Sequence, residues 1–237
     1  KNVIVPAEIE GKPVTKFTEY FLKDTDIEEI TFSEGITKIP SIKDCDSLKV
    51  INLPSTTESI ETFRFCNGLE EININENELY KSVDGVLYSA DGLTLTAFPI
   101  GRTDSFIIPK TVKTIGRYAF ANSKLSEIIL YNKIEPHAIK VIEEYAFWGC
   151  TKLEGLIIPA SVTAIHYNAF QTEQMLYARA ASRPEGWSDS WVSQSTYVIW
   201  NYKEHYVDST NGVTYVLCND NTAIAVSFDG SVKEVVI

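Results

Sequence analysis

The stretch IEEYAFWGCTKLEGLIIPASV, residues Ile142–Val162, is written in related form at two other places in the chain. Residues 115–130 read IGRYAFANSKLSEIIL, and residues 165–170 read IHYNAF. A phrase that recurs at short intervals is typical of a repeat protein, in which each unit is too short to bury its own apolar face and therefore stacks on its neighbours. This recurrence decides the fold.

The repeat follows one frame through most of the chain: Pro, an aliphatic residue, Ile, an Ala-Phe pair or a single aromatic residue, a small residue or Cys, and then Leu-x-x-Ile-x-Ile. Equivalent positions are 21 residues apart at Ile39 and Ile60, and 23 residues apart at Phe147 and Phe170. This interval is in the range of leucine-rich repeats. The early copies are degraded, and KIPSIKDCDSLKVINLP (38–54) lacks the Ala-Phe pair.

Within one unit, alternation places apolar side chains on the inside of a short strand and their neighbours on the outside. The inward residues in the quoted unit are Leu153, Leu156 and Ile158. Pro159 ends the strand because it cannot donate a backbone hydrogen bond to the ladder. The Ala-Phe pair fills the opposite wall of the coil, so the phenylalanines of successive units are expected to stack as an inward column: Phe120, Phe147 and Phe170.

The predicted fold is an α/β solenoid that is mostly β, namely a right-handed leucine-rich-repeat solenoid with short parallel strands and inserted β-hairpins. IGRYAFANSKLSEIIL and IEEYAFWGCTKLEGLIIP resemble the BspA-type leucine-rich repeats of bacterial surface proteins, and the resemblance covers about residues 1–180. It implies a secreted or cell-surface bacterial protein that engages host or microbial surface proteins.

Two segments interrupt the repeats and share a pattern. Residues 82–99 carry Asp-Gly, a strong hairpin signal, and residues 209–228 repeat the arrangement, with Gly-Val-x-Tyr at 85–88 and again at 212–215. The Trp-rich residues 179–200 are expected to form a cap or irregular coil over the end of the stack. We therefore divide the chain into a repeat array (1–180) and an end segment (181–237), in which the second hairpin leads into a truncated repeat.

The composition bears on the classes of partner. With 21 Lys and Arg against 32 Asp and Glu, the net charge is −11, which disfavours binding to nucleic-acid backbones. No apolar run is long enough for insertion into a membrane. The chain begins at Lys1 without a visible signal peptide, and Lys233–Ile237 look like the start of another repeat, so we expect a segment of a longer protein.

Motifs for catalysis are not recognisable. The sequence holds no phosphate loop, nucleophile elbow, zinc-protease motif or dinucleotide fingerprint. The four cysteines lack zinc-ligand spacing, so we expect no metal and no cofactor and interpret the cysteines as buried thiols. Two alternatives stay open: a disulfide between Cys45 and Cys66, which share one repeat position, and a catalytic dyad of Cys150 with His166.

The candidate ligand-binding residues lie on the outward strand positions. The carboxylates there form two columns along one face of the solenoid, either as a solvated face that keeps the array soluble or as a stripe that faces a ligand. Trp148 follows an inward phenylalanine and should point elsewhere, where it could contact a partner. The candidates are Glu28, Glu29, Glu70, Glu71, Asp104, Glu127, Glu154 and Trp148.

These observations predict a non-catalytic module for protein binding or adhesion, with an extracellular protein or glycan as its ligand. A structural spacer within a larger surface protein is one alternative, and it predicts a surface without a large apolar or aromatic patch. A hydrolase with an unrecognised carboxylate site is the other, and it predicts a deep pocket with two carboxylates at glycosidase spacing.

Overall fold

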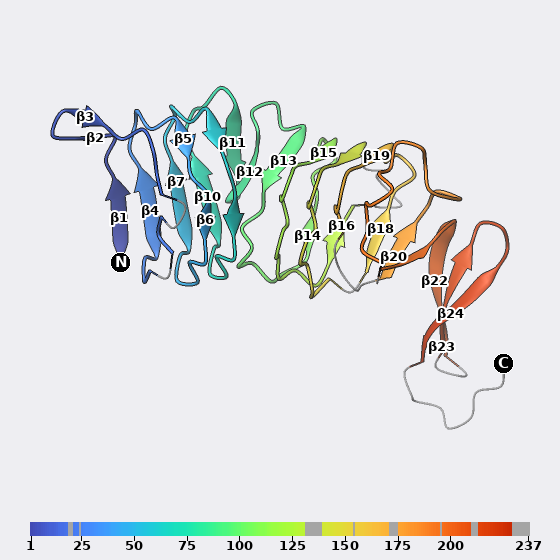
Figure 1. The fold of residues 1–237 in the computed structure, drawn as a ribbon. Coiled ribbons are helices and arrows are strands. Elements are labelled where there is room, and N and C mark those ends of the chain that lie inside the picture. The colour runs from blue at the N-terminus through green and yellow to red at the C-terminus, as the bar shows by residue number, and fades with distance from the viewer. Residues whose placement is uncertain are drawn as a thin grey trace.

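The computed structural model describes residues 1–18, 21–23, 25–130, 139–153, 155–170, 175–194, 196–209 and 213–228. The coils stack side by side into an elongated body, with the N-terminus at one end and a group of longer strands at the other (Figure 1). The described residues contain short strands and turns and no helix. The prediction of a solenoid built on short parallel strands is confirmed, and the part of the chain that the structure describes is wholly β and irregular.

The first half of the stack, which we call the N-terminal array (residues 1–74), carries a parallel sheet in which equivalent residues pair. Ile30, Ile51 and Ile72 are in register and fully buried, because every second side chain of each strand points inward. The strands of this sheet are β1 (Asn2–Val5), β4 (Glu29–Phe32), β7 (Val50–Leu53) and β10 (Glu71–Ile74). The other walls hold two strand pairs, β5 (Lys38–Ile39) with β8 (Ser59–Ile60) and β6 (Ile42–Lys43) with β9 (Phe63–Arg64). A hairpin projects from the first coil and consists of β2 (Glu8–Ile9) and β3 (Lys12–Pro13).

The second half, which we call the C-terminal array (residues 98–178), has the same plan. One wall contains β14 (Phe106–Ile107) paired with β16 (Ile128–Ile129), then β18 (Leu156–Ile158), β20 (Met175–Ala178) and β21 (Tyr197–Ile199). The opposite wall contains β15 (Thr114–Ile115), β17 (Val141–Ile142) and β19 (Ala164–Ile165). Leu153, Leu156 and Ile158 are buried and Ile157 is half-buried, as the alternation predicts.

The inward phenylalanine column is confirmed. Phe120, Phe147 and Phe170 have no exposed surface, and successive rings lie parallel with centroids 5.2 and 4.9 Å apart. Trp191 covers the last ring edge-on at 5.8 Å, and Trp187 pairs with Ile165 as the next coil would. The Trp-rich stretch is therefore an irregular coil that closes the column, and Trp187 and Trp191 are buried as this role requires.

Both inserted segments form three-stranded antiparallel meanders, one strand more than a hairpin. The first meander contains β11 (Tyr80–Val83), β12 (Val86–Ser89) and β13 (Thr94–Ala97), and the Asp91-Gly92 turn joins the last two. The second contains β22 (Tyr202–Asp208), β23 (Val213–Cys218) and β24 (Ala223–Phe228). Gly212 of the shared pattern lies outside the described residues.

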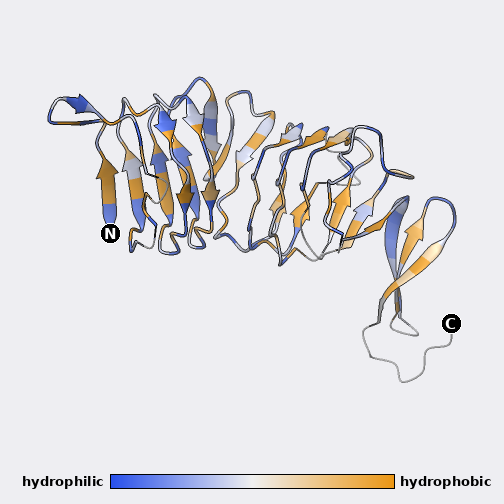
Figure 2. Ribbon diagram, in the orientation of Figure 1, coloured by the Kyte–Doolittle hydropathy of each residue, from blue (hydrophilic) through white to orange (hydrophobic). Residues whose placement is uncertain are grey.

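The first meander divides the stack into two apolar cores. One core runs from Val5 to Leu87 and the other from Val86 to Trp191, so the two meet at β12. Figure 2 shows apolar residues alternating with polar ones along the strands on both sides of this point. The strand β13 begins a new parallel wall with β15 and does not pair with β8. The stacking of that wall is thus interrupted between β8 and β13.

Candidate functional site

The acidic strand face of the N-terminal array is aligned but well compensated. Glu29, Val50 and Glu71 are in register across β4, β7 and β10, and Lys49 stands between Glu28 and Glu70. In each column, carboxylates therefore alternate with other residues, so like charges are two strands and not one strand apart, which limits their repulsion.

Amide side chains also tie this face together. Asn2 donates a hydrogen bond to Glu29 over 2.7 Å, and Asn52 donates one to the same carboxylate over 2.9 Å. Asn73 donates a hydrogen bond to Glu71 over 3.3 Å. Glu29 and Glu71 are thus held by amide side chains of neighbouring residues.

The first meander separates these residues from the other candidates. Ile72 donates its backbone N–H to the carbonyl of Gly85 over 2.9 Å, so the turn between β11 and β12 lies against β10. Beyond it, Asp104 and Glu127 are exposed at the starts of β14 and β16. Glu154 lies outside the described residues. The structure therefore places the predicted acidic residues in two groups and does not join them into one stripe.

The two arrays meet closely on one side of the interruption. Gly101 donates its backbone N–H to the carbonyl of Leu69 over 2.8 Å, and a Cβ on Gly101 would lie 2.7 Å from backbone atoms of Gly68 and Leu69. Lys124 crosses the same boundary and donates to the Asn67 carbonyl over 3.0 Å. We call this region, where the coils around residues 41–69 face those around residues 94–152, the junction.

Trp148 lies at the junction and is half-buried. Its ring meets the ring of Phe65 edge-on at 5.9 Å, although the two residues belong to different arrays. Phe65 retains 36% of its surface exposed and lines a groove of about 580 Å³, which we call the aromatic groove. The groove is further lined by Asn67, Thr103, Asn122, Ser123, Lys124, Ser126, Gly149, Thr151 and Lys152.

The charge of the aromatic groove is opposite to that of the whole protein. Its lining includes Lys124 and Lys152 and no carboxylate, whereas the chain carries a net charge of −11. Asn122 lies beneath Gly149, and its Oδ1 is buried without a hydrogen-bond partner among the described residues. The groove thus offers an aromatic contact with amide, hydroxyl and ammonium groups around it.

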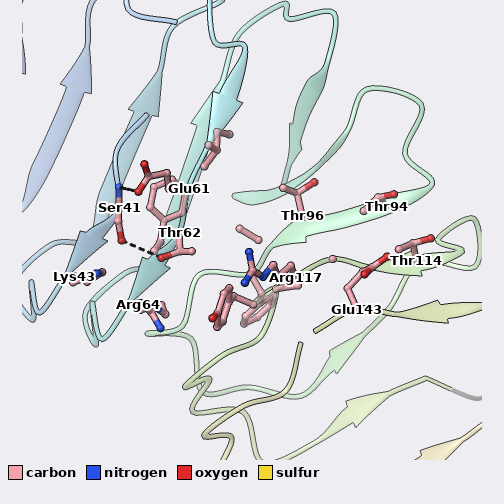
Figure 3. Close-up of a pocket in the computed structure, with 17 residues that line it drawn as sticks. Ser41, Lys43, Glu61, Thr62, Arg64, Thr94, Thr96, Thr114, Arg117 and Glu143 are labelled. Atoms are coloured by element: carbon pink, nitrogen blue, oxygen red, sulfur yellow. Dashed lines mark hydrogen bonds between the residues drawn. The ribbon is translucent and has the colours of Figure 1, made fainter. Parts of the chain in front are cut away.

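A second concavity opens where β8 and β13 fail to pair. This inter-array cleft has a volume of about 760 Å³. Figure 3 shows one wall with Ser41, Glu61, Thr62 and Arg64, the other with Thr94, Thr96, Thr114 and Glu143, and Arg117 between them. Its lining contains two carboxylates, Glu61 on one wall and Glu143 on the other, and each of them contacts a residue on its own side.

Those wall contacts are specific. The Glu61 carboxylate accepts the Ser41 backbone N–H over 3.2 Å, and Glu143 lies 3.4 Å from Nδ1 of His166. Tyr118, which also lines the cleft, stacks in parallel on Tyr145 with ring centroids 4.9 Å apart. The cleft therefore combines hydroxyl groups, an aromatic ring and cations in a space open to solvent.

The cysteines are structural. All four are buried thiols, so the alternative of a bridge between Cys45 and Cys66 is not realised in the structure. The neighbouring Cys45 and burial both raise the pKa of Cys66, and burial raises the pKa of Cys150 to about 12. Because a nucleophilic thiol needs a lowered pKa, the proposed dyad with His166 lacks its nucleophile.

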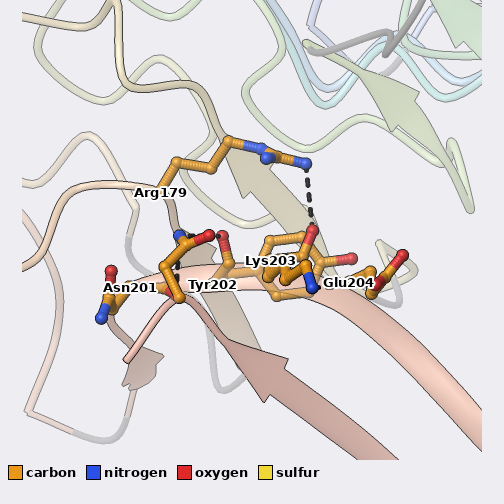
Figure 4. Close-up of polar contacts among 6 residues, drawn as sticks. Arg179, Asn201, Tyr202, Lys203 and Glu204 are labelled. Atoms are coloured by element: carbon orange, nitrogen blue, oxygen red, sulfur yellow. Dashed lines mark hydrogen bonds and ion pairs between the residues drawn. The ribbon is translucent and has the colours of Figure 1, made fainter. Parts of the chain in front are cut away.

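The second meander lies beside the last strands of the C-terminal array. Arg179 donates a hydrogen bond to the Lys203 carbonyl over 3.2 Å and lies 5.5 Å from the centre of the Tyr202 ring (Figure 4). Tyr202 and Nδ1 of His205 are 3.0 Å apart, and burial lowers the pKa of His205. Glu127 lines a shallow pocket with this histidine, so that candidate lies beside the meander.

Sequence reasoning did not find Phe65, Arg64 or Arg117 as site residues. They come together only because the first meander displaces the C-terminal array from the N-terminal array. No sequence motif indicates that displacement. One available signal was the residue before Cys66, which is aromatic where the preceding coil has Asp44.

Other kinds of site are not seen in the part of the chain that the structure describes. Among those residues, no group of three or more His, Cys, Asp or Glu side chains is placed to hold a metal ion. A search of the same residues for helices long and apolar enough to cross a membrane finds none.

Comparison with known proteins gives the family. Among solved structures, similar folds include a leucine-rich repeat protein from Eubacterium ventriosum, with 19% identity and a TM-score of 0.48 over 85% of this chain and 67% of that one. The pneumococcal vaccine antigen PcpA shares 17% identity with a TM-score of 0.45 over 84% of this chain and 78% of that one. A leucine rich cell surface protein from Faecalibacterium prausnitzii shares 25% identity with a TM-score of 0.36 over 62% and 58%.

A search of curated proteins finds no match. The sequence profile described as "BspA type Leucine rich repeat region" matches residues 7–93 and 93–182 in six copies. The matched residues include the recurring Ala-Phe phrase, the parallel strands that pair in register and the phenylalanine column. They cover most of the chain, and the chain therefore belongs to the family of BspA-type leucine-rich repeat proteins.

Proposed function

We propose that this chain is a non-catalytic protein-binding module of a secreted or cell-surface bacterial protein, and that it contacts its partner through the aromatic groove. The observation that carries the proposal is the partly exposed ring of Phe65, which lines a groove open to solvent and is held edge-on against the half-buried Trp148 of the other array. Exposed aromatic residues at the centre of a concave surface are typical of binding hot spots. The family of surface-protein repeats supports an extracellular setting.

The lining of the groove defines the kind of partner. Lys124 and Lys152 line the groove together with Phe65 and without a carboxylate, so a complementary surface carries an apolar side chain flanked by acidic groups. The acidic strand face remains a second candidate, but its amide hydrogen bonds give it the character of a solvated face. A pure spacer would not need a partly exposed aromatic ring in this environment.

The test compares variants on a panel of purified extracellular matrix and cell-surface proteins. We expect saturable binding to at least one of them. A double variant, Phe65→Ala with Trp148→Ala, should lose at least roughly thirtyfold in affinity, because truncating a hot-spot aromatic costs about 2 kcal/mol or more. Tyr197→Ala is the matched control, since Tyr197 is an aromatic residue with 73% of its surface exposed at the other end of the stack.

Two results would count against the proposal. Binding that survives the double variant but is lost with Glu28→Lys and Glu70→Lys would assign the contact to the strand face. The absence of binding across the whole panel would favour the spacer. Circular dichroism and thermal unfolding of each variant separate a lost contact from a lost fold.

A further inference from the structure

Three cations, Lys43, Arg64 and Arg117, line the inter-array cleft together with two carboxylates, Glu61 and Glu143. The guanidinium carbon Cζ of Arg64 lies 4.9 Å from the centre of the Tyr118 ring, and Cζ of Arg117 lies 5.1 Å from the same centre. Two cations that share one aromatic ring repel each other, and the ring offsets only part of that cost. The arrangement is stabilised further when an anion lies between or beside the two guanidinium groups.

The partners of these cations are unevenly distributed. Arg117 has Glu144 at 3.4 Å, where both side chains are largely exposed. Arg64 and the nearby Lys43 take part in no ion pair among the described residues, and Nε of Arg64 is buried there without a hydrogen-bond partner. In a protein of net charge −11, an arginine left without a carboxylate at the wall of an open cleft is unusual.

The remaining lining is rich in hydroxyl groups. Ser41 and Thr62 lie on one wall, with their hydroxyl oxygens 3.1 Å apart, and three more threonines lie on the other wall. Hydroxyl groups both donate and accept hydrogen bonds, so they suit a ligand that itself carries many hydroxyl groups.

We propose that the inter-array cleft binds a carboxylate-bearing sugar, such as a uronic or sialic acid residue of a glycan. The carboxylate is paired by Arg64, with Arg117 beside it, and the sugar hydroxyls bond to the serine and threonine side chains. The two guanidinium groups suit this role because their planar donors match a carboxylate. This site is separate from the aromatic groove and does not depend on it.

The overall charge selects among anionic ligands. A polyanion would be repelled by the net charge of −11 and by Glu61 and Glu143 in the lining. A sugar with a single carboxylate brings one charge to the cations and presents neutral hydroxyl groups to the rest of the lining. The proposal therefore excludes nucleic acids and strongly acidic peptides as the preferred ligands.

The test uses ligands that differ in one group. Binding of methyl β-D-glucuronide and of the methyl glycoside of N-acetylneuraminic acid is compared with that of methyl β-D-glucoside by ligand-observed NMR and calorimetry. The acidic sugars should bind at least roughly tenfold more tightly than the neutral one, and Arg64→Gln should remove that difference, because a charge-assisted hydrogen bond contributes about this much. Arg183→Gln is the control, since Arg183 pairs with Asp189 outside the cleft.

Several outcomes would overturn the proposal. Equal binding of acidic and neutral sugars, or no binding of either, would show that the cations do not recognise a sugar carboxylate. Tighter binding of the peptide acetyl-Glu-Thr-Glu-amide than of the acidic sugars would assign the cleft to acidic peptides. Because Arg64→Gln could disturb the wall, Arg64→Lys is measured as well. It keeps the charge but loses the planar fork, and it should retain only part of the preference.

Discussion

One equivalent position in several coils adopts a left-handed backbone conformation, and the residue at that position changes along the stack. Asp44 and Asn168 have φ values of 57° and 49°, which such short polar residues tolerate. Phe65, Tyr118 and Tyr145 hold φ values of 56° to 57° at the equivalent position, although this conformation is strained for aromatic residues. Phe65 lines the aromatic groove, and Tyr118 lines the inter-array cleft. Strain that is kept at a concave surface is consistent with a role in binding.

The phenylalanine column gives a residue-scale prediction of stability. Phe147 is fully buried between two parallel rings, so Phe147→Ala leaves a cavity that its neighbours cannot fill. We expect a loss of about 3–5 kcal/mol in the free energy of unfolding, measured by chemical denaturation. Phe65→Ala, at a partly exposed ring, should cost much less. Equal losses for the two variants would contradict the assigned burial.

Cys150 predicts a dependence on alkaline pH. Burial raises its pKa to about 12 from an ordinary value near 9, so the folded protein keeps the proton that the unfolded chain releases. The stabilising contribution of this thiol is complete below about pH 9 and is lost as the pH rises toward 12, because the unfolded state then binds fewer protons. Thermal unfolding between pH 8 and pH 11 should show a smaller decline for Cys150→Ala than for the wild type. Identical declines would contradict the buried neutral thiol.

At the scale of elements, the sequence predicted individual strands and turns better than the way in which the two arrays meet. The alternation around Leu156 and the Asp91-Gly92 turn are local signals, and the strands and the turn that they predict are present. The strand β11 and the separation of the two arrays were not predicted. They depend on contacts such as that of Phe65 with Trp148, which are distant in sequence and belong to no motif. Tertiary packing, and not local preference, decides where such side chains meet.

Gly101 is the element-scale test of the junction. Its position leaves no room for a Cβ, because the atoms 2.7 Å away belong to the backbone of Gly68 and Leu69 and cannot rotate aside. Gly101→Ala should destabilise the protein by about 1–3 kcal/mol and increase proteolytic cleavage near the first meander. Ser105→Ala, an exposed position on the same segment, is the control. Unchanged stability for Gly101→Ala would contradict the close approach of the arrays.

At the scale of the whole molecule, the junction differs from the rest of the chain in both charge and shape. The chain carries a net charge of −11, yet basic side chains outnumber carboxylates on the two concave surfaces of the junction. The five basic side chains are Lys43, Arg64, Arg117, Lys124 and Lys152, and the two carboxylates are Glu61 and Glu143. A solenoid without an interruption would offer a smooth strand face. The inserted meander creates concave surfaces on an otherwise regular stack, and these surfaces attract acidic groups.

This charge distribution predicts a salt dependence. Binding of an acidic protein partner in the aromatic groove should weaken as salt rises, because exposed charges are screened within about 8 Å at physiological ionic strength. Lys124→Gln with Lys152→Gln should reduce both the affinity and its salt dependence, as measured by surface capture across a salt series. A binding constant that is flat with salt for the wild type would contradict an electrostatic contribution from these lysines.

The central claim is that the junction, and not the acidic strand face, is the surface that contacts a protein partner. Hydrogen exchange of the chain, with and without a bound partner from the panel, tests it most directly. The account predicts slowed exchange in the segments that form the aromatic groove, residues 64–67, 122–126 and 148–153. Slowed exchange confined to the strands at residues 29–32, 50–53 and 71–74, with no change in the groove, would contradict it.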